Sequence, residues 1–322
     1  MNNTILTEKS KYSYVVCAVM FGADETLLNI KLYDGFSFVR KSLMPLRDHL
    51  DSIFETDAMG LRRDYEAARI STQSLDVICA IKEVTVELNR ADADNFFNEE
   101  NDRNLAVLDN QIRAIRFIEE CPLRCKKIAF KMQSESEKIN ETEFTKKFCE
   151  IYPVNESSET PEITKLICDK AISDKINKRL PSISFPLADG VLNMCHIYYD
   201  LSYHQKRHLS IILLTTALEM IYLENEQAKK EKLSKRCAVY INDRKEDQVD
   251  CYKNLRYIYK KRSDFVHEGL FDHIEDNDIL LLRRYVRESL FKAISDKTDK
   301  KQRIENLKYA IANIDYLNET VR

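Results

Sequence analysis

The stretch CYKNLRYIYKKRSDFVHEGL, residues 251–270, decides how the second half of the chain is expected to fold. Its apolar and aromatic residues recur mostly at steps of three and four, the period of a helix with one buried side: Tyr252, Leu255, Tyr259, Val266 and Leu270. Gly269 can adopt the left-handed backbone conformation that ends a helix. The sequence therefore predicts a helix that ends at Gly269 and carries His267 in its last turn.

The polar residues of this helix have offsets that matter for chemistry. Tyr259, Ser263 and His267 are spaced at i, i+4 and i+8 and share one face, and Arg262 lies three residues after Tyr259. The five steps from Arg262 to His267 turn the helix about 140° beyond a full circle, so the two side chains flank the edge of a cleft. Two copies related by a twofold axis would bring two arginines and two histidines to one groove, so a homodimer is the expected active form.

The segment YKKRSDFVHEG, residues 259–269, resembles the motif of HEPN domains, in which a polar residue follows an arginine and a histidine comes four to six positions after that arginine. It is most similar to the ApeA-like branch, whose pattern reads approximately Tyr-x-x-Arg-Ser-x-x-Val-His-Gly. Glu268 departs from this pattern, since it separates the histidine from the glycine. Ala217, Leu218 and Glu219 in an upstream apolar segment also match the branch. The resemblance covers roughly the C-terminal half of the chain, from about Ser202.

The resemblance implies a metal-independent endoribonuclease that needs no cofactor. The 2′-hydroxyl of RNA would attack the adjacent phosphorus, His267 would move the protons, and Arg262 would hold the charge that builds on the phosphoryl oxygens. Ser263 would orient the histidine or the phosphate, and Tyr259 and Glu219 would support the site. The expected products are a 2′,3′-cyclic phosphate and a 5′-hydroxyl, and DNA would not be cut. The alternative is an inactive HEPN module that serves only in dimerisation or RNA binding.

The resemblance also implies a biological setting. Proteins of this kind serve in prokaryotic defence against phage, where an inactive nuclease is released as a toxin that cuts tRNA or other cellular RNA. The N-terminal half would then sense a phage or regulatory trigger, or restrain the nuclease. RNA and a second copy of the chain are the expected partners.

Glu219 interrupts the apolar stripe of a helix expected from about residue 205 to 225. A carboxylate in such a stripe is costly unless it is paired. Two interpretations stay open at this point: Glu219 reaches Arg262 or His267, or it sits at the edge of the stripe.

The chain carries 50 Lys and Arg against 53 Asp and Glu, a formal net charge of −3. Contact with nucleic acid must therefore come from a local basic face. Lys253, Arg256 and Lys260 lie at i, i+3 and i+7 on one side of the motif helix. They either follow an RNA backbone toward the cleft or form an ordinary solvated face.

Two pairs of residues have a spacing found in metal sites, but we expect no metal at either. Between His204 and His208 the sequence lacks the glutamate that activates water in a metalloprotease helix. Cys121 and Cys125 form a pair without a second pair nearby. Nine unevenly spaced cysteines, with no signal peptide, point to buried thiols in a reducing cytoplasm. The longest apolar run, residues 211–223, is too short to cross a bilayer.

The remaining patterns predict a mainly helical chain: an α+β N-terminal domain at residues 1–158, followed by an all-α HEPN helical bundle at 159–322. Only five glycines and six prolines, with a charged fraction of 32%, argue against a loop-rich all-β fold. The acidic segment 92–102 is expected to be a solvated loop, and segment 191–199 to be a strand or the start of the first bundle helix. Expected strands are 12–22, 27–32, 75–88 and 128–130; expected helices are 45–54, 103–120, 162–176, 205–225, 231–242, 279–295 and 301–317.

Overall fold

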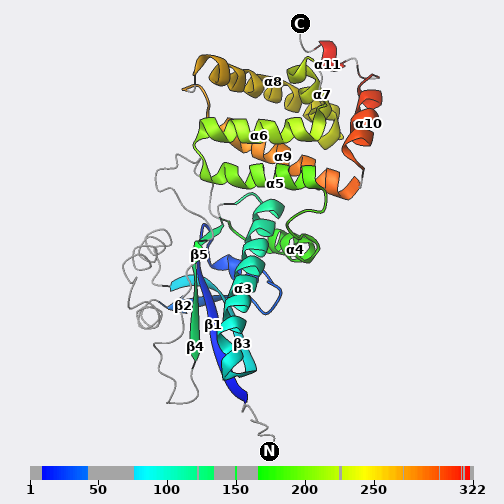
Figure 1. The fold of residues 1–322 in the computed structure, drawn as a ribbon. Coiled ribbons are helices and arrows are strands. Elements are labelled where there is room, and N and C mark those ends of the chain that lie inside the picture. The colour runs from blue at the N-terminus through cyan, green and yellow to red at the C-terminus, as the bar shows by residue number, and fades with distance from the viewer. Residues whose placement is uncertain are drawn as a thin grey trace, which may run out of the picture. The chain divides into compact units, whose positions relative to one another are not determined.

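The computed structural model describes residues 9–42, 76–121, 123–133, 149–150, 166–224, 227–270, 272–296, 298–312, 314 and 316–319. The chain divides into two compact units, each of which is described by itself (Figure 1). The first unit comprises Met1–Val154 and Thr164–Ser184, and the second comprises Asn155–Ile163 and Phe185–Arg322. The segment Thr164–Ser184, which the sequence placed after the domain boundary, thus belongs to the first unit.

The first unit contains an antiparallel sheet in which β1 is the central strand. Its order within the described residues is β2-β3-β1-β4-β5, and β1 pairs with both β3 and β4. Every residue from Tyr14 to Phe21 is buried, which means that side chains on both faces of β1 are covered. The strands are β1 (Lys9–Phe21), β2 (Ser37–Ser42), β3 (Asp76–Asn89), β4 (Arg124–Gln133) and β5 (Cys149–Glu150), so the strands predicted at 12–22, 75–88 and 128–130 are confirmed.

The strand predicted at 27–32 is wrong, because its first half lies in a 3₁₀ helix, Glu25–Asn29, and its second half is not a strand. Asp24 caps this helix with a carboxylate oxygen that accepts a hydrogen bond from the amide of Thr26 at 2.9 Å. A short polar side chain that captures the backbone in this way favours a turn over an extended strand. Leu27 still buries its side chain fully from the 3₁₀ turn. The helix predicted at 45–54 lies outside the described residues.

The long helix α3 (Arg90–Ile118) begins well before the residue predicted for it, and it includes the acidic segment expected to be a loop. That prediction is wrong for a physical reason. The helix dipole favours acidic side chains in the first turn, and glutamate is a good helix former further along, so a dense acidic group does not by itself indicate a loop. Further along, α3 buries the side chains of Asn104, Gln111 and Ile115 completely.

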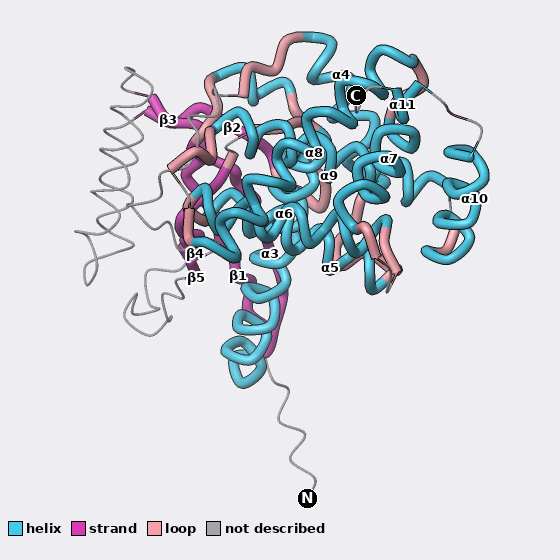
Figure 2. The backbone as a smooth tube through the Cα atoms, turned by 90° about the horizontal axis from the view of Figure 1, so that it is seen from above, coloured by secondary structure: helices cyan, strands magenta, loops and turns pink. Residues whose placement is uncertain are grey.

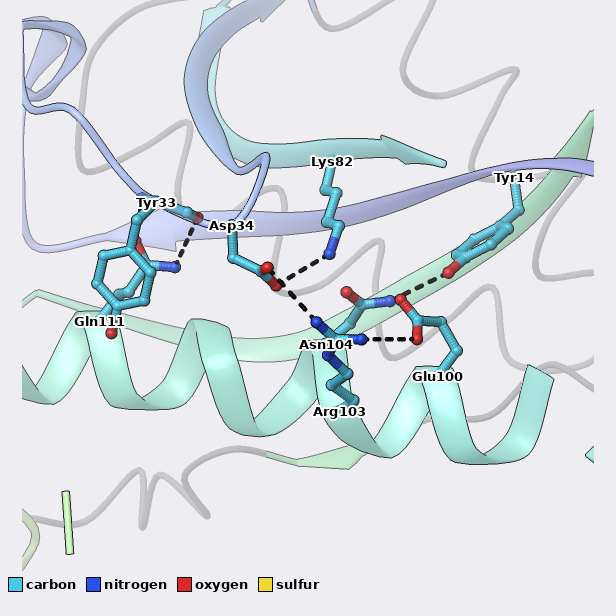
Figure 3. Close-up of polar contacts among 8 residues, drawn as sticks. All are labelled: Tyr14, Tyr33, Asp34, Lys82, Glu100, Arg103, Asn104 and Gln111. Carbon is cyan, nitrogen blue, oxygen red and sulfur yellow. Dashed lines mark hydrogen bonds and ion pairs between the residues drawn. The ribbon is translucent and has the colours of Figure 1, made fainter. Parts of the chain in front are cut away.

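Figure 3 shows how α3 holds the turn that precedes β2. The amide of Tyr33 donates to Oε1 of Gln111 at 2.8 Å, and Nε2 of Gln111 donates back to the carbonyl of Tyr33 at 3.2 Å. Asp34, at φ 57°, has a carboxylate 3.0 Å from Nζ of Lys82 on β3 and 3.7 Å from Arg103 on α3. The turn is therefore tied to both the helix and the sheet.

Helix α4 (Lys170–Arg179) completes the first unit and packs against α3. Asp169 caps it by accepting a hydrogen bond from the amide of Ile172 at 2.8 Å. Leu166 forms a parallel bridge with Ala23. The helix predicted from 162 consequently begins only at Lys170.

The second unit is a bundle in which α6 contacts α5, α7, α8 and α9 (Figures 1 and 2). Segment 191–199, which the sequence left open, is helical. The bundle helices are α5 (Gly190–Leu201), α6 (Arg207–Tyr222), α7 (Lys229–Ile241), α8 (Lys245–Glu268), α9 (Asp276–Asp296), α10 (Lys300–Ala312) and α11 (Tyr316–Glu319). An α+β unit followed by a helical one is thus observed. Among the described residues, no helix is both long enough and apolar enough to cross a membrane.

Candidate active site

Helix α8 ends as the sequence predicted. Gly269 has a φ of 72°, and its amide donates to the carbonyl of Phe265 at 3.0 Å. A left-handed residue after the last helical turn satisfies a carbonyl that the helix leaves free. His267 lies in that last turn, and its side chain is exposed. Glu268 extends the helix by one residue without disturbing the glycine cap.

Tyr259 and Glu219 meet across the interface between α8 and α6. The hydroxyl of Tyr259 donates to Oε1 of Glu219 at 2.7 Å. Burial raises the pKa of Tyr259, and the hydrogen bond to the Glu219 carboxylate raises it further. The phenol consequently keeps its proton at neutral pH. The sequence left the partner of Glu219 open between Arg262, His267 and none, and the structure assigns Tyr259 to it.

Arg262 is half-buried and lies over the ring of Tyr259, with the guanidinium carbon 5.5 Å from the ring centroid. Its Nε is buried and has no hydrogen-bond partner, and among the described residues no carboxylate pairs with it. Arg256, six residues earlier, differs: its Nε lies 3.4 Å from Glu231, and it donates to the hydroxyl of Tyr252 at 3.2 Å. Arg262 is thus fixed by a ring face while its charge stays unneutralised.

The structure brings Tyr259, Glu219 and Arg262 together, but it does not join Ser263 and His267 to them by hydrogen bonds. Ser263 is half-buried, and within the described residues neither its side chain nor that of His267 forms a hydrogen bond or ion pair. His267 therefore relates to Arg262 only through the geometry of α8, about 140° around the helix axis.

Exposed apolar side chains surround the end of α8. Val266 and Leu270 flank His267 and are 46% and 49% exposed. Leu209, in the first turn of α6, is 41% exposed, and its neighbour His208 lies with its ring 5.3 Å from that of Phe265. Because His208 and Phe265 are in contact, the beginning of α6 lies beside the end of α8. His267 thus lies beside the exposed side chains of Val266 and Leu270, and the α6 contact is made two residues earlier, at Phe265.

A buried ion pair fixes the loop that follows α8. Nζ of Lys261 donates to Oδ2 of Asp278 at 2.7 Å, and the two side chains are 4% and 7% exposed. Asp278 also accepts a hydrogen bond from the amide of Glu275 at 2.8 Å, a pattern that caps the beginning of α9. The helix predicted at 279–295 begins three residues earlier, at Asp276. Sequence reasoning missed Lys261, because no periodicity reveals a pair 17 residues apart on two helices.

The three basic residues predicted to contact an RNA backbone differ in exposure and in their ion pairs. Lys253 and Lys260 are exposed and form no ion pair within the described residues. Arg256 is half-buried and held by Glu231 and Tyr252. The two lysines are therefore available to a ligand, whereas Arg256 is engaged within the bundle.

The two pairs with metal-like spacing are arranged as follows. His204 ends the 3₁₀ turn Ser202–His204 and His208 lies in α6, so the two are not on one helix. Cys121 and Cys125 are fully buried free thiols, and burial raises the pKa of both, that of Cys121 to about 12. In the part of the chain that the structure describes, no group of three or more His, Cys, Asp or Glu could hold a metal ion.

Comparison with known proteins returns no relative. No family model matches the chain, and neither the curated proteins nor the solved structures contain a match. The chemistry of the site therefore has to be argued from its own residues.

Proposed function

We propose that the C-terminal unit is a metal-independent endoribonuclease of the HEPN type. The observation that carries the proposal is the environment of Arg262, a half-buried guanidinium fixed on the Tyr259 ring without a carboxylate partner among the described residues. A charge held partly out of water without a partner costs free energy, and such unbalanced groups cluster at functional sites. The planar guanidinium matches the geometry of a phosphate. The exposed His267, five residues further on, supplies an imidazole that can accept and donate a proton.

The proposed reaction balances with these groups alone. One imidazole accepts the proton of the 2′-hydroxyl as the 2′-oxygen bonds to phosphorus. The bond from phosphorus to the 5′-oxygen breaks, and a second imidazole gives that oxygen a proton. Arg262 stabilises the negative charge on the phosphoryl oxygens. Tyr259 and Glu219 position Arg262, because the hydrogen bond of 2.7 Å between them fixes the ring on which the guanidinium lies.

The second imidazole is proposed to come from a second copy of the chain. Val266 and Leu270 expose apolar side chains next to His267 in the chain. Apolar side chains grouped next to a polar reactive group are typical of a surface that another chain covers. A twofold axis near His267 would place both histidines in one groove. RNA, including tRNA, is the proposed substrate, and release of the nuclease during anti-phage defence is the proposed setting.

The N-terminal unit is proposed as the sensor or restraint of this nuclease. Its thiols at Cys121 and Cys125 are fully buried, with the pKa of both raised by burial, so they are poor nucleophiles. A unit whose described thiols are all buried, joined to a potential toxin, fits a regulatory role better than a second catalytic one.

The test uses the purified full chain and end-labelled RNA in EDTA. We expect cleavage that leaves 2′,3′-cyclic phosphate and 5′-hydroxyl ends, and no cleavage of DNA of the same sequence. Arg262→Ala and His267→Ala should each lower the rate about 100-fold or more, because each removes a group that acts in the transition state. The control is Arg244→Ala, which truncates the arginine at the N-cap of the same helix, whose side chain is 78% exposed.

Two outcomes would contradict the proposal. Cleavage that persists in both Arg262→Ala and His267→Ala would place the active site elsewhere. A wild-type chain that dimerises or binds RNA but never cuts it would leave the inactive HEPN module, the alternative that the sequence raised. Circular dichroism of each variant shows whether the bundle still folds.

A further inference from the structure

Tyr257 presents an exposed aromatic ring on α8, although no role was predicted for it. Its side chain is 59% exposed, while the neighbouring helical positions Leu255 and Ile258 are buried. Exposing this much of a large ring has no packing benefit, so an exposed ring held in a fixed place indicates a contact surface.

The ring of Tyr257 is held from below. Nζ of Lys261 lies 4.5 Å from the ring centroid, and that ammonium is clamped by Asp278 at 2.7 Å. Lys261 is 4% exposed, whereas the phenol above it faces water. The ring therefore lies over an ammonium group that Asp278 holds, while more than half of the side chain is exposed to solvent. A ring fixed before binding loses little conformational entropy when a partner stacks on it.

Two free cations flank this ring. Lys253 and Lys260 lie four residues before and three residues after Tyr257, so all three share one side of α8. Both lysines are exposed and unpaired within the described residues. We call Lys253, Tyr257 and Lys260 the α8 strip. It spans about 10 Å along the helix axis.

Acidic residues limit the strip at both ends. Asp250 is exposed one turn before Lys253, and the half-buried Asp264 follows Lys260 by four residues. Between these limits the side chains offer only positive charge and one aromatic face. Arg256 does not belong to the strip, because Glu231 and Tyr252 hold it.

We propose that the α8 strip binds single-stranded RNA, with one base stacked on Tyr257 and the flanking phosphates on Lys253 and Lys260. Phosphate contacts that alternate with an aromatic platform are the means by which proteins bind single strands. A duplex keeps its bases stacked on one another and cannot offer a face to the ring. The inference rests on the proposed function and adds the substrate class. Tyr257 and His267 are ten residues apart, about 15 Å along the axis, which separates the stacked base from the cut phosphate by a few nucleotides.

The experiment measures binding separately from cleavage, with the full chain and a fluorescein-labelled single-stranded RNA whose 2′-hydroxyls are methylated so that it cannot be cut. Tyr257→Ala should weaken binding about 5- to 100-fold, the loss expected for one stacked base. Tyr257→Phe should bind within about twofold of wild type, because stacking needs the ring and not the hydroxyl. The matched control is Tyr309→Ala, which removes a tyrosine that is 79% exposed on α10.

A second measurement reports the stacking directly. The chain contains no tryptophan, so Tyr257→Trp introduces a single indole whose fluorescence should be quenched when RNA binds. Tyr309→Trp should show no quenching. Lys253→Ala and Lys260→Ala should each reduce the salt dependence of binding by about 0.7 in the slope of log K against log salt.

Three outcomes would each overturn the inference. Tyr257→Ala could bind RNA as tightly as wild type, the indole at 257 could show no quenching, or the chain could prefer duplex RNA to single-stranded RNA. These results are separable from the nuclease test. A chain that cuts RNA but shows none of these effects refutes the strip and leaves the proposed function standing. A chain that binds the methylated strand through Tyr257 but cuts no RNA supports the strip and refutes the proposed nuclease function.

Discussion

The buried pair of Lys261 and Asp278 ties α8, the helix that carries Arg262 and His267, to the beginning of α9. Burial acts to lower the pKa of Lys261, but the hydrogen bond and charge of Asp278 outweigh it, so the pKa is raised. A raised lysine pKa means that the folded state binds its proton more tightly than the unfolded state does. This stabilisation is complete below about pH 10.4, the ordinary lysine value, and is lost as the pH rises through the raised pKa.

Removing one partner of this pair should therefore be costly. We expect Lys261→Met to lower the free energy of unfolding by about 3–5 kcal/mol, because it leaves the carboxylate of Asp278 buried without a cation. Urea denaturation of the full chain followed by circular dichroism measures the change. The control is Arg284→Ala, which breaks an exposed pair with Glu288 and should cost less than about 1 kcal/mol. Equal effects of the two substitutions would show that the Lys261 pair is no more important than a surface pair.

Tyr259 offers a second test at the same scale, because its ring and its hydroxyl have separate partners. Tyr259→Phe removes the hydrogen bond to Glu219 but keeps the ring under Arg262. We expect it to lower kcat for RNA cleavage less than Tyr259→Leu, which removes both, while KM changes little. The physical reason is that the ring fixes Arg262 and the hydrogen bond only fixes the ring. Steady-state kinetics of the two variants checks this order, and an equal loss in both would assign the role to the hydroxyl.

At the scale of elements, the turn before β2 depends on one buried amide side chain. Gln111 is fully buried and bonds to both the amide and the carbonyl of Tyr33. Gln111→Leu should lower the free energy of unfolding by about 1–3 kcal/mol, because it leaves two backbone groups without partners. Amide hydrogen exchange at Tyr33 should become faster in this variant. Gln302→Leu, on the exposed side of α10, should change neither quantity.

An element can be predicted from the sequence when its periodicity and its capping residues indicate the same structure. The helix that ends at Gly269 was predictable, because periodicity and a glycine cap agree there. The 3₁₀ turn after Asp24 was not predictable, because local capping overrode the average behaviour of its residues. The early start of α3 was not predictable either, because acidic residues occur both in loops and within helices. Periodicity also identifies Tyr252, Leu255 and Tyr259 on the buried face of α8, but Val266 and Leu270, which it placed on the same face, are exposed. It does not identify the side chain of another helix that meets this face. The contact of Tyr259 with Glu219 and of Lys261 with Asp278 therefore needed the structure.

At the scale of the whole molecule, the proposed reaction depends on a second copy of the chain. His267 lies beside Val266 and Leu270, and the three side chains are exposed in one copy. If a twofold interface covers them, burying this apolar surface contributes to dimer stability at about 25 cal/mol per Å². A charge placed there would have to be desolvated without a partner, which opposes association.

A charge introduced at Leu270 should therefore prevent association of the two copies. Leu270→Glu should convert a dimeric wild-type chain to a monomer in light scattering at micromolar concentration, and cleavage should be lost with the dimer. Tyr309→Glu, on the exposed surface of α10, is the control and should leave both unchanged. Dilution gives an independent check, because the specific activity of a dimer-dependent enzyme falls as the chain dissociates while that of a monomeric enzyme does not. A wild-type chain that is monomeric at these concentrations and cuts RNA with constant specific activity would mean that one copy carries the complete site, and the second proton-transfer group would then have to be sought within the same chain.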